Sequence, residues 1–365
     1  MKITYSLPQE DLACILSQTE KMWAELRGKR IFLSGGTGFF GIWLVESFAF
    51  ANERLGLGAQ LGVLTRDVAG THRRYPHLQS LEGVTFYEGD VRTFEFPEAG
   101  RGREFSHVIH AATPSGVESL SLEPLNNFGI IVEGTRRMLE FAVGSGVEKF
   151  LFVSSGAVYG EQPPQMSHVA EDYRGAPDPL SLKSTYGECK RLGEHLCQLY
   201  GAKYGFEAKT ARPFAFVGPY LPLKAAFAIG NFLENILQES PIEILGDGSP
   251  FRSYLYAADL AAWLWTVLFK GQAGRAYNVG AEEEISIGGL ASLLSQGSWI
   301  SAPVPVHIRK TPLPAALASR YVPSTQRAQT ELGLKQNYSL SQAIERTIEW
   351  HRAQKQSAGD PYAPH

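Results

Sequence analysis

The sequence contains few cysteines and little net charge. Its three cysteines in 365 residues, Cys14, Cys189 and Cys197, form no Cys-x-x-Cys pair and no cluster with histidines. This pattern argues against a disulfide framework and against a zinc site, and it fits a reducing compartment. Because the formal net charge is −3, the chain has no overall basic field, and we expect neither nucleic acid nor a membrane surface as a partner.

Long apolar runs are also missing. No window approaches the roughly 20 apolar residues of a membrane span, and the first residues, MKITYSLPQEDLACIL, lack the apolar core of a signal peptide. We therefore expect a soluble, cytoplasmic protein. With 44% apolar residues the chain can bury a large core, and its length favours one large and one smaller lobe.

Residues 1–27 predict an amphipathic helix. Apolar residues recur at helical spacing from Leu12 onward, and Ser6 with Gln9 forms a capping-box pattern around Pro8. We expect this helix to pack against the main domain or against a second subunit.

Six short apolar runs alternate with helical stretches through residues 28–213. This repetition predicts a Rossmann-type, doubly wound parallel α/β sheet. The expected strands are residues 30–34, 60–65, 84–88, 107–111, 149–154 and 207–212. Residues 214–352, richer in Pro and Gly, predict a smaller mixed α/β substrate-binding lobe, part of which returns to the sheet. The polar residues 353–365 predict a disordered tail.

The first predicted strand runs directly into GGTGFFG, which places Gly35, Gly38 and Gly41 three residues apart before a helix. Glycines at this spacing allow the backbone to turn tightly and to approach a pyrophosphate at the helix N-terminus. The motif therefore indicates a dinucleotide cofactor, although a glycine-rich turn can also serve packing alone.

The second predicted strand ends in VLTRD. Thr65 stands where an acidic residue would bind the ribose hydroxyls of NAD, and Arg66 follows it, which favours the 2'-phosphate of NADP. The alternative is a solvated Arg66 with Asp67 on the ribose. Asp90, after the third strand, is the expected partner of the adenine amino group.

The segment STYGECK places Tyr186 and Lys190 on one face of a predicted helix. An adjacent ammonium and a nicotinamide cation favour the phenolate of a tyrosine, whose ordinary pKa of about 10 makes it a poor base at neutral pH. Ser155, at the end of the fifth strand, is a candidate to hold a substrate hydroxyl against Tyr186.

Taken in order, several motifs together resemble the extended short-chain dehydrogenase/reductases of the nucleotide-sugar epimerase/dehydratase branch. The motifs are GGTGFFG, GDV, HAAT, SSGAVYG, YGECK, RPFAFVGP, GDGSPFRSYLYAADL and YNVG, and the likeness runs from about Lys29 to His351. It implies a nucleotide-diphosphate sugar as substrate and a homodimer that pairs the helices containing residues 133–142 and 186–197.

The resemblance also assigns roles to residues. It makes Tyr186 the general acid/base, Lys190 the residue that lowers the pKa of Tyr186 and holds the nicotinamide ribose, and Ser155 the hydroxyl that bonds the reacting sugar. Arg252 is expected on the diphosphate. The other substrate-binding residues expected are Thr113 and Asn231; the cofactor-binding residues expected are Gly35, Thr37, Gly38, Phe39, Phe40, Gly41, Arg66, Asp90, Val91, Ala111, Ala112, Tyr186, Lys190 and Pro213.

Three departures from the family pattern bear on the reaction. Ile131 and Ala215 replace asparagines that family members often carry. Gly156 and Ala157 replace the Asp-Glu pair that family 4,6-dehydratases place after the catalytic Ser/Thr. The decarboxylating relatives usually have an acid at the second of these two positions, and it is missing as well.

Without those acids, oxidation and re-reduction of an alcohol remain. We therefore predict an NAD(P)-dependent epimerase in which Tyr186 takes the proton of a sugar hydroxyl at C4. An NADPH-dependent 4-keto-sugar reductase, a dehydratase using Glu161 or Glu171, and a non-catalytic dinucleotide sensor are the alternatives. His110, in HAAT, is expected to be a packed residue that lines the cofactor cleft.

Overall fold

The computed structural model describes residues 4–97, 105–114, 123–224, 227–311 and 317–358. Its centre is a seven-stranded sheet in which every strand pairs in parallel with its neighbours, in the order β11-β6-β5-β4-β1-β2-β3. The strands are β1 Arg30–Ser34, β2 Gln60–Thr65, β3 Val84–Glu88, β4 His107–His110, β5 Lys149–Val153, β6 Glu207–Pro213 and β11 Ala276–Val279. The predicted fold class is confirmed.

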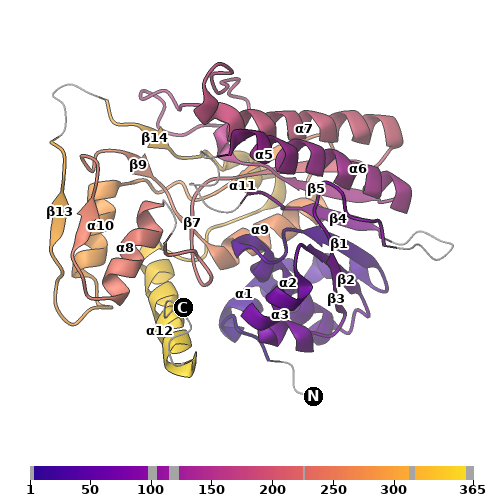
Figure 1. The fold of residues 1–365 in the computed structure, drawn as a ribbon, viewed down its shortest axis with the longest axis horizontal. Helices are drawn as coiled ribbons and strands as arrows, with labels where there is room; N and C mark the ends of the chain where they lie inside the picture. Colours follow the sequence, from indigo (N-terminus) through magenta and orange to yellow (C-terminus); the bar gives the residue numbers. More distant parts are fainter. Residues whose placement is uncertain (1–3, 98–104, 115–122, 225–226, 312–316, 359–365) are drawn as a thin grey trace.

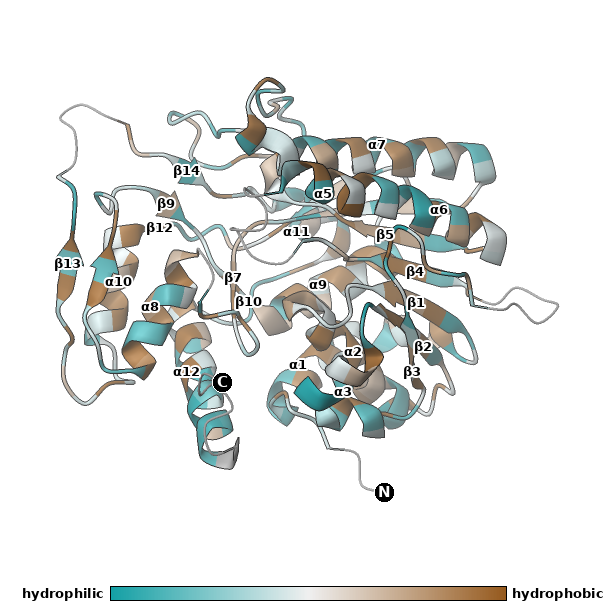
Figure 2. Ribbon diagram, in the orientation of Figure 1, coloured by the Kyte–Doolittle hydropathy of each residue, from teal (hydrophilic) through white to brown (hydrophobic). Residues whose placement is uncertain are grey.

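Helices cover both faces of this sheet (Figure 1). On one face lie α5 Pro124–Phe128, α6 Gly134–Ser145 and α7 Thr185–Tyr204; on the other lie α1 Gln9–Thr19, α2 Phe39–Leu55 and α9 Ala257–Lys270, while α3 Val68–Arg74 connects β2 to β3. The central strands are mostly apolar and buried, because helices cover both faces of the sheet; Figure 2 colours the ribbon by hydropathy. Phe32 of β1 and Trp265 of α9, for example, are fully buried.

The smaller lobe is built from short elements. It contains β7 Phe216–Val217, α8 Ala228–Leu237, β8 Ile242–Ile244, β9 Phe251–Arg252, β10 Leu255–Tyr256, β12 Ile285–Ser286, α10 Ile287–Gln296, β13 Val306–Ile308 and β14 Arg320–Tyr321. Helix α9 and strand β11 return to the large sheet, followed later by α11 Gln326–Leu332, which packs against β11, and by α12 Leu340–Ala358. The short three-stranded sheet β12-β9-β14 carries side chains to the site described below.

The N-terminal segment packs onto the main domain. Helix α1 lies against α2 and α9, with Leu12 and Ile15 buried. The predicted capping box is wrong, since no side chain caps α1. Instead the buried carboxylate of Glu46 accepts hydrogen bonds from the backbone N–H groups of Ser6 and Leu7, each at 2.9 Å. A residue of α2 therefore bonds the N–H groups just before α1, where a local side-chain cap was expected.

The C-terminal helix corrects the predicted tail. Helix α12 continues to Ala358, so residues 353–358 are helical where a disordered tail was expected, and residues 359–365 lie outside the described part of the chain. Within the described residues, no helix is both long and apolar enough to cross a bilayer.

Candidate active site

The predicted site residues gather at one edge of the large sheet. Gly35 follows β1, Arg66 follows β2, Asp90 lies just beyond β3, Ala111 follows β4 and Ser155 lies just beyond β5. All of these strands are parallel, so their carboxyl ends share one edge. The chain order reverses between β1 and β4, and such a switch point is where doubly wound sheets bind ligands.

The glycine-rich loop fits a bound pyrophosphate. Gly35 has φ +78°, and a Cβ on it would lie 2.6 Å from the backbone of Ala111. A Cβ on Gly41 would lie 2.2 Å from the carbonyl oxygen of Gly35. Gly38, by contrast, is exposed and caps α2 without a side-chain hydrogen bond. The first N–H groups of α2 are thus left to face an anion.

Arg66 and Asp90 lie just beyond β2 and β3, where the sequence predicts the adenosine end of the cofactor. Thr65 is buried, and its hydroxyl lies 3.0 Å from that of Thr71, while Arg66 is exposed. Asp67 caps α3 by accepting a hydrogen bond from the N–H of Gly70 at 2.7 Å. The carboxylate oxygen of Asp67 that makes this bond is therefore engaged in holding the helix.

Asp90 is held by Arg92, whose guanidinium donates to both carboxylate oxygens at 2.8 Å. Hydrogen bonding to Arg92 lowers the pKa of Asp90, and the charge of Arg66 contributes in the same direction. Arg66 and Asp90 are therefore close enough for their charges to interact.

Other residues expected at the cofactor lie along the same edge. Val91 is buried and follows Asp90, Ala112 is half-buried after β4, and Pro213 ends β6. Thr37, Phe39 and Phe40 lie in the glycine-rich turn and the first turn of α2.

Four predicted residues come together at the same edge of the sheet: Tyr186, Lys190, Ser155 and Thr113. Lys190, almost fully buried on α7, donates to the carbonyl oxygen of Val153 at 2.8 Å, and its Nζ lies 5.8 Å from the centre of the Tyr186 ring. Helix α7 and the end of β5 thus present one phenol, one ammonium and one serine to the same space.

Burial is the main influence on the pKa values of Tyr186 and Lys190. Burial raises the pKa of Tyr186, and hydrogen bonding to Ser155 and Thr113 lowers it again. Burial lowers the pKa of Lys190 to about 8, while the charge of Glu194 acts in the opposite direction. Without cofactor the phenol is therefore protonated at neutral pH, and the groups found to lower its pKa are the two hydroxyls.

The two neighbouring serines of SSGAVYG point to different partners. Ser154 donates to Glu194 Oε1 at 2.6 Å, and Arg212 holds the same carboxylate with two hydrogen bonds of 2.9 and 2.6 Å. Ser155 Oγ instead accepts from the N–H of Ala157 at 3.1 Å. Glu194 and Arg212 support the site from behind, and sequence reasoning missed this role.

Gly156 has no room for a side chain. A Cβ there would lie 2.7 Å from the Phe214 ring and 2.7 Å from the hydroxyl of Tyr321. Tyr321 comes from β14 and was not expected at the site; its phenol interacts with the Ser155 hydroxyl. No local motif marks it, because only the folding of the smaller lobe places β14 here.

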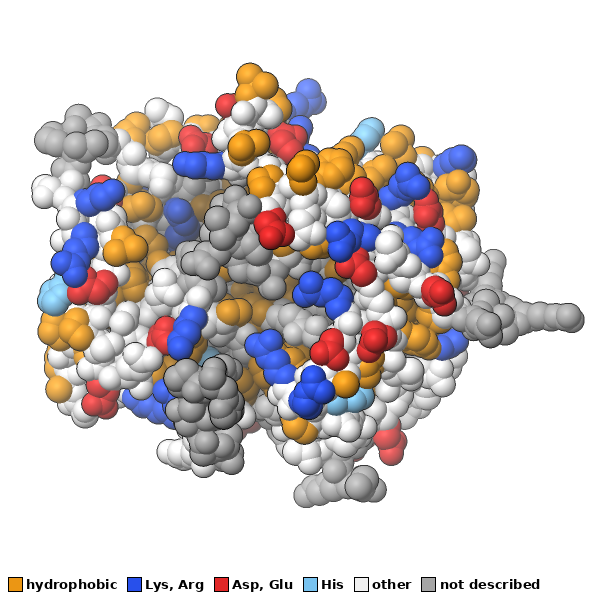
Figure 3. All heavy atoms as spheres, viewed as in Figure 1, with side chains coloured by type: hydrophobic (Ala, Val, Ile, Leu, Met, Phe, Trp, Pro, Cys, Tyr) orange, Lys and Arg blue, Asp and Glu red, His pale blue; other side chains and the backbone are white. Residues whose placement is uncertain are grey.

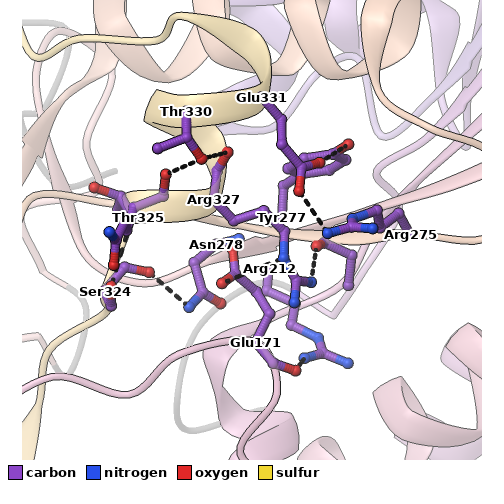
Figure 4. Close-up of polar contacts among 12 residues, drawn as sticks. Glu171, Arg212, Arg275, Tyr277, Asn278, Ser324, Thr325, Arg327, Thr330 and Glu331 are labelled. Carbon is purple, nitrogen blue, oxygen red and sulfur yellow. Dashed lines mark hydrogen bonds and ion pairs between the residues drawn. The ribbon is translucent and has the colours of Figure 1, made fainter.

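The two glutamates suggested as replacement acids have different surroundings. Glu161 is exposed. Glu171 accepts a hydrogen bond from the N–H of Asn278 at 2.8 Å and lies 3.8 Å from Arg327, and Figure 4 shows it among these residues and Arg212. It lines a separate cavity of about 480 Å³ with Arg212 and others, a lining that includes neither Ser155 nor Tyr186.

Two of the predicted substrate-binding residues, Arg252 and Asn231, lie on the smaller lobe. Arg252 on β9 is half-buried and donates to the carbonyl oxygen of Phe251 at 2.7 Å. Asn231 is exposed on α8. Arg252 is opposite Tyr321 in the pairing of β9 with β14, so it reaches the group that surrounds Ser155.

His110 is a packed residue. Its Nδ1 lies 2.6 Å from Ser34 Oγ and its Nε2 lies 3.0 Å from Thr135 Oγ1. Burial lowers the pKa of His110 to about 3, so the ring is neutral and serves to join β1, β4 and α6. Among the described residues, no group of three or more His, Cys, Asp or Glu side chains is placed to hold a metal ion.

Comparison with known proteins gives consistent matches. Residues 31–280 match the model of the NAD dependent epimerase/dehydratase family. UDP-glucuronic acid decarboxylase 1 of Xenopus tropicalis is 26% identical over 94% of this chain and 77% of its own length. The dTDP-D-glucose 4,6-dehydratase of Mus musculus is 25% identical over 89% of each chain. The structure of UDP-glucose 4-epimerase from Thermus thermophilus in complex with NAD aligns with a TM-score of 0.70 and 25% identity, covering 88% of this chain and 99% of that one.

Proposed function

Because the chain belongs to the NAD-dependent epimerase/dehydratase family of enzymes, we propose that it is a nucleotide-sugar epimerase that acts by transient oxidation of a sugar hydroxyl at C4. The observation that carries this choice is the crowded Gly156, where Phe214 and Tyr321 occupy the space of an acid. Elimination of water needs an acid and a base beyond the group that serves the oxidised hydroxyl. Neither Glu161 nor Glu171 supplies one.

The residues present fit a nicotinamide dinucleotide. The N-terminus of α2 would hold the pyrophosphate, Lys190 the nicotinamide ribose, and Asp90 with Arg66 the adenosine end. When bound, the cofactor supplies reversible hydride transfer and a positive charge beside Tyr186.

Each remaining side chain has one task in the reaction. Tyr186 takes the proton of the C4 hydroxyl and later returns it, Ser155 orients that hydroxyl, and the hydroxyl of Thr113 favours the phenolate. The cationic Arg252 suits the diphosphate of the substrate, since a guanidinium fork matches phosphate oxygens. Asn231 on α8 extends this surface toward the nucleotide. The relatives' names, which refer to UDP- and dTDP-sugars, support this class of substrate.

Product analysis in deuterated water tests the reaction. An epimerase acting at C4 is expected to change the configuration of the sugar without placing solvent deuterium on carbon, since the same hydride leaves and returns. A dehydratase would lose the 6-hydroxyl and place solvent deuterium at C5, because the hydride taken from C4 returns to C6 and a solvent proton replaces the one removed from C5. That product would overturn the proposal and show that acids from elsewhere replace the missing pair.

A 4-keto-sugar reductase is the second candidate, and the end of β2 favours it. Thr65 offers no carboxylate to a ribose, and the exposed Arg66 suits the 2'-phosphate of NADP. The family description and the relative solved with NAD leave this preference as a proposal. Stoichiometric oxidation of NADPH by a 4-keto nucleotide sugar would establish a reductase, whereas an epimerase would turn over without net consumption.

We also propose a homodimer joined through α7 and its neighbours. Leu192 and Leu199 on α7 are 40% and 52% exposed, and Leu125 on α5 is 89% exposed. Hydrophobic side chains lie along this edge in Figure 3. Met138, Leu139 and Phe141 of α6 are buried in the subunit core and do not add to this surface. Light scattering at micromolar concentration should give twice the mass of the chain, and Leu199→Glu should shift it to the monomer; a wild-type monomer would contradict the proposal.

A further inference from the structure

Tyr321 reaches the catalytic group from the smaller lobe. Strand β14 pairs in parallel with β9, which places Tyr321 opposite Arg252 and on the same face of that small sheet. The ring of Tyr321 packs on Phe214 with centroids 4.6 Å apart. Its hydroxyl lies 2.7 Å from the position that a Cβ on Gly156 would take. A second phenol, from the smaller lobe, therefore lies next to Ser155 and Gly156.

Tyr321 limits the hydrogen bonds that the hydroxyl of Ser155 can make. A serine hydroxyl donates one hydrogen bond and accepts two. One acceptor position already takes the N–H of Ala157. Both phenols also interact with this hydroxyl. Burial raises the pKa of Tyr321 far above neutrality, so Tyr321 keeps its proton while Tyr186 acts as the base.

We propose, building on the proposed function, that Tyr321 is a positioning residue that donates to Ser155 Oγ. With Ala157 and Tyr321 filling both acceptor positions, the serine has its single proton left to give. That proton is directed to the phenolate of Tyr186 in the absence of sugar, and to the sugar oxygen when the substrate is bound. The phenol that excludes an acid beside Gly156 thus also sets the direction of the hydrogen bond made by Ser155.

Titration of Tyr186 in the NAD-bound protein tests this without any sugar. The phenolate of Tyr186 is measured as the near-ultraviolet difference between each protein and the same protein carrying Tyr186→Phe. Tyr321→Phe is expected to raise the pKa of Tyr186 by about half a unit to one unit, the value of one hydrogen bond. Ser155→Ala should raise it at least as much, and the double variant no further than Ser155→Ala alone.

The outcomes separate this inference from the proposed epimerase activity. Tyr254→Phe is the matched control, because Tyr254 is another buried phenol near Arg252, and it should leave the titration unchanged. An unchanged pKa in Tyr321→Phe, or an effect that adds in full to that of Ser155→Ala, would overturn the inference. Once a substrate is in hand, Tyr321→Phe should lower kcat about tenfold, leave KM unchanged and shift the pH profile upward. A purely structural role would instead lower the thermal midpoint without moving the profile.

Discussion

Replacing Gly156 by alanine tests the crowding that separates this site from those of dehydratases. The added Cβ would lie 2.7 Å from both the Phe214 ring and the Tyr321 hydroxyl, closer than carbon tolerates, so the two rings must move. Overpacking of this kind costs about 1 to 3 kcal/mol. Unfolding entropy of roughly 2 cal/mol/K per residue converts this to a thermal midpoint lowered by about 1 to 4 °C for a chain of this length. Turnover should fall by at least about tenfold, because Ser155 shifts with the loop.

The controls for this substitution come from the same chain. Gly246→Ala adds a methyl group where no atom lies within 4 Å, and it should keep the midpoint of the wild type in a calorimetric scan. Adding Tyr321→Phe to Gly156→Ala removes one of the two close contacts and should restore part of the lost stability. A Gly156→Ala protein as stable and active as the wild type would refute the reasoning. So would a Gly156→Asp, Ala157→Glu protein that folds and dehydrates its substrate.

The other predictions concern the cofactor, the base and acid stability. Arg66→Ala should cost about 1.5 to 3 kcal/mol of NADP affinity and leave NAD affinity unchanged by titration calorimetry, which equal losses for both cofactors would contradict. Tyr186→Phe should abolish turnover while cofactor still binds, and Ser155→Ala should lower kcat about 10²-fold, since it removes an orienting hydrogen bond but leaves the base. Burial lowers the pKa of His110 from 6.5 to about 3, so the folded state holds the ring in its neutral form. The stability that this contributes is present above pH 6.5 and is lost as pH falls toward 3, because the unfolded chain takes up the proton first. Unfolding of His110→Gln should depend less on pH across that window, and an unchanged dependence would count against this assignment.

The large sheet was predictable because its strands are covered on both faces. Buried parallel strands read as continuous apolar runs bounded by turn residues, and β1, β2, β4 and β5 carry that signal. Strands β3 and β6 are less apolar, and the alternation of strands with helices is what predicts them. The seventh, β11, has only the residues AYNV, and the short elements β7 to β10 together with α8 and α9 separate it from β6 along the chain. Its place beside β6 depends on tertiary contacts with α11 and α9, which no local pattern expresses.

The candidate site was predictable where the chain brings its parts together locally. Gly35 follows a strand and precedes a helix, and Tyr186 and Lys190 are one helical turn apart, so their meeting follows from secondary structure alone. Tyr321 belongs to a two-residue strand in the smaller lobe. Glu194 does lie one turn beyond Lys190, but its role depends on Arg212 from β6. Tyr321 and the pair of Glu194 with Arg212 were not predicted, because they depend on contacts between elements far apart in the sequence, and no residue spacing marks such contacts.

The division of work between Ser154 and Ser155 follows from the backbone of β5 and its extension. Successive side chains of an extended chain point to opposite sides, so Ser154 turns toward α7 and Ser155 toward the cleft. Glu194 receives Ser154 and Arg212 on the same helix that carries Tyr186. Three hydrogen bonds to one carboxylate thus fix the helix against two strands of the sheet. The hydrogen bonds that Glu194 receives from Ser154 and Arg212 therefore fix Tyr186, on α7, relative to Ser155, at the end of β5.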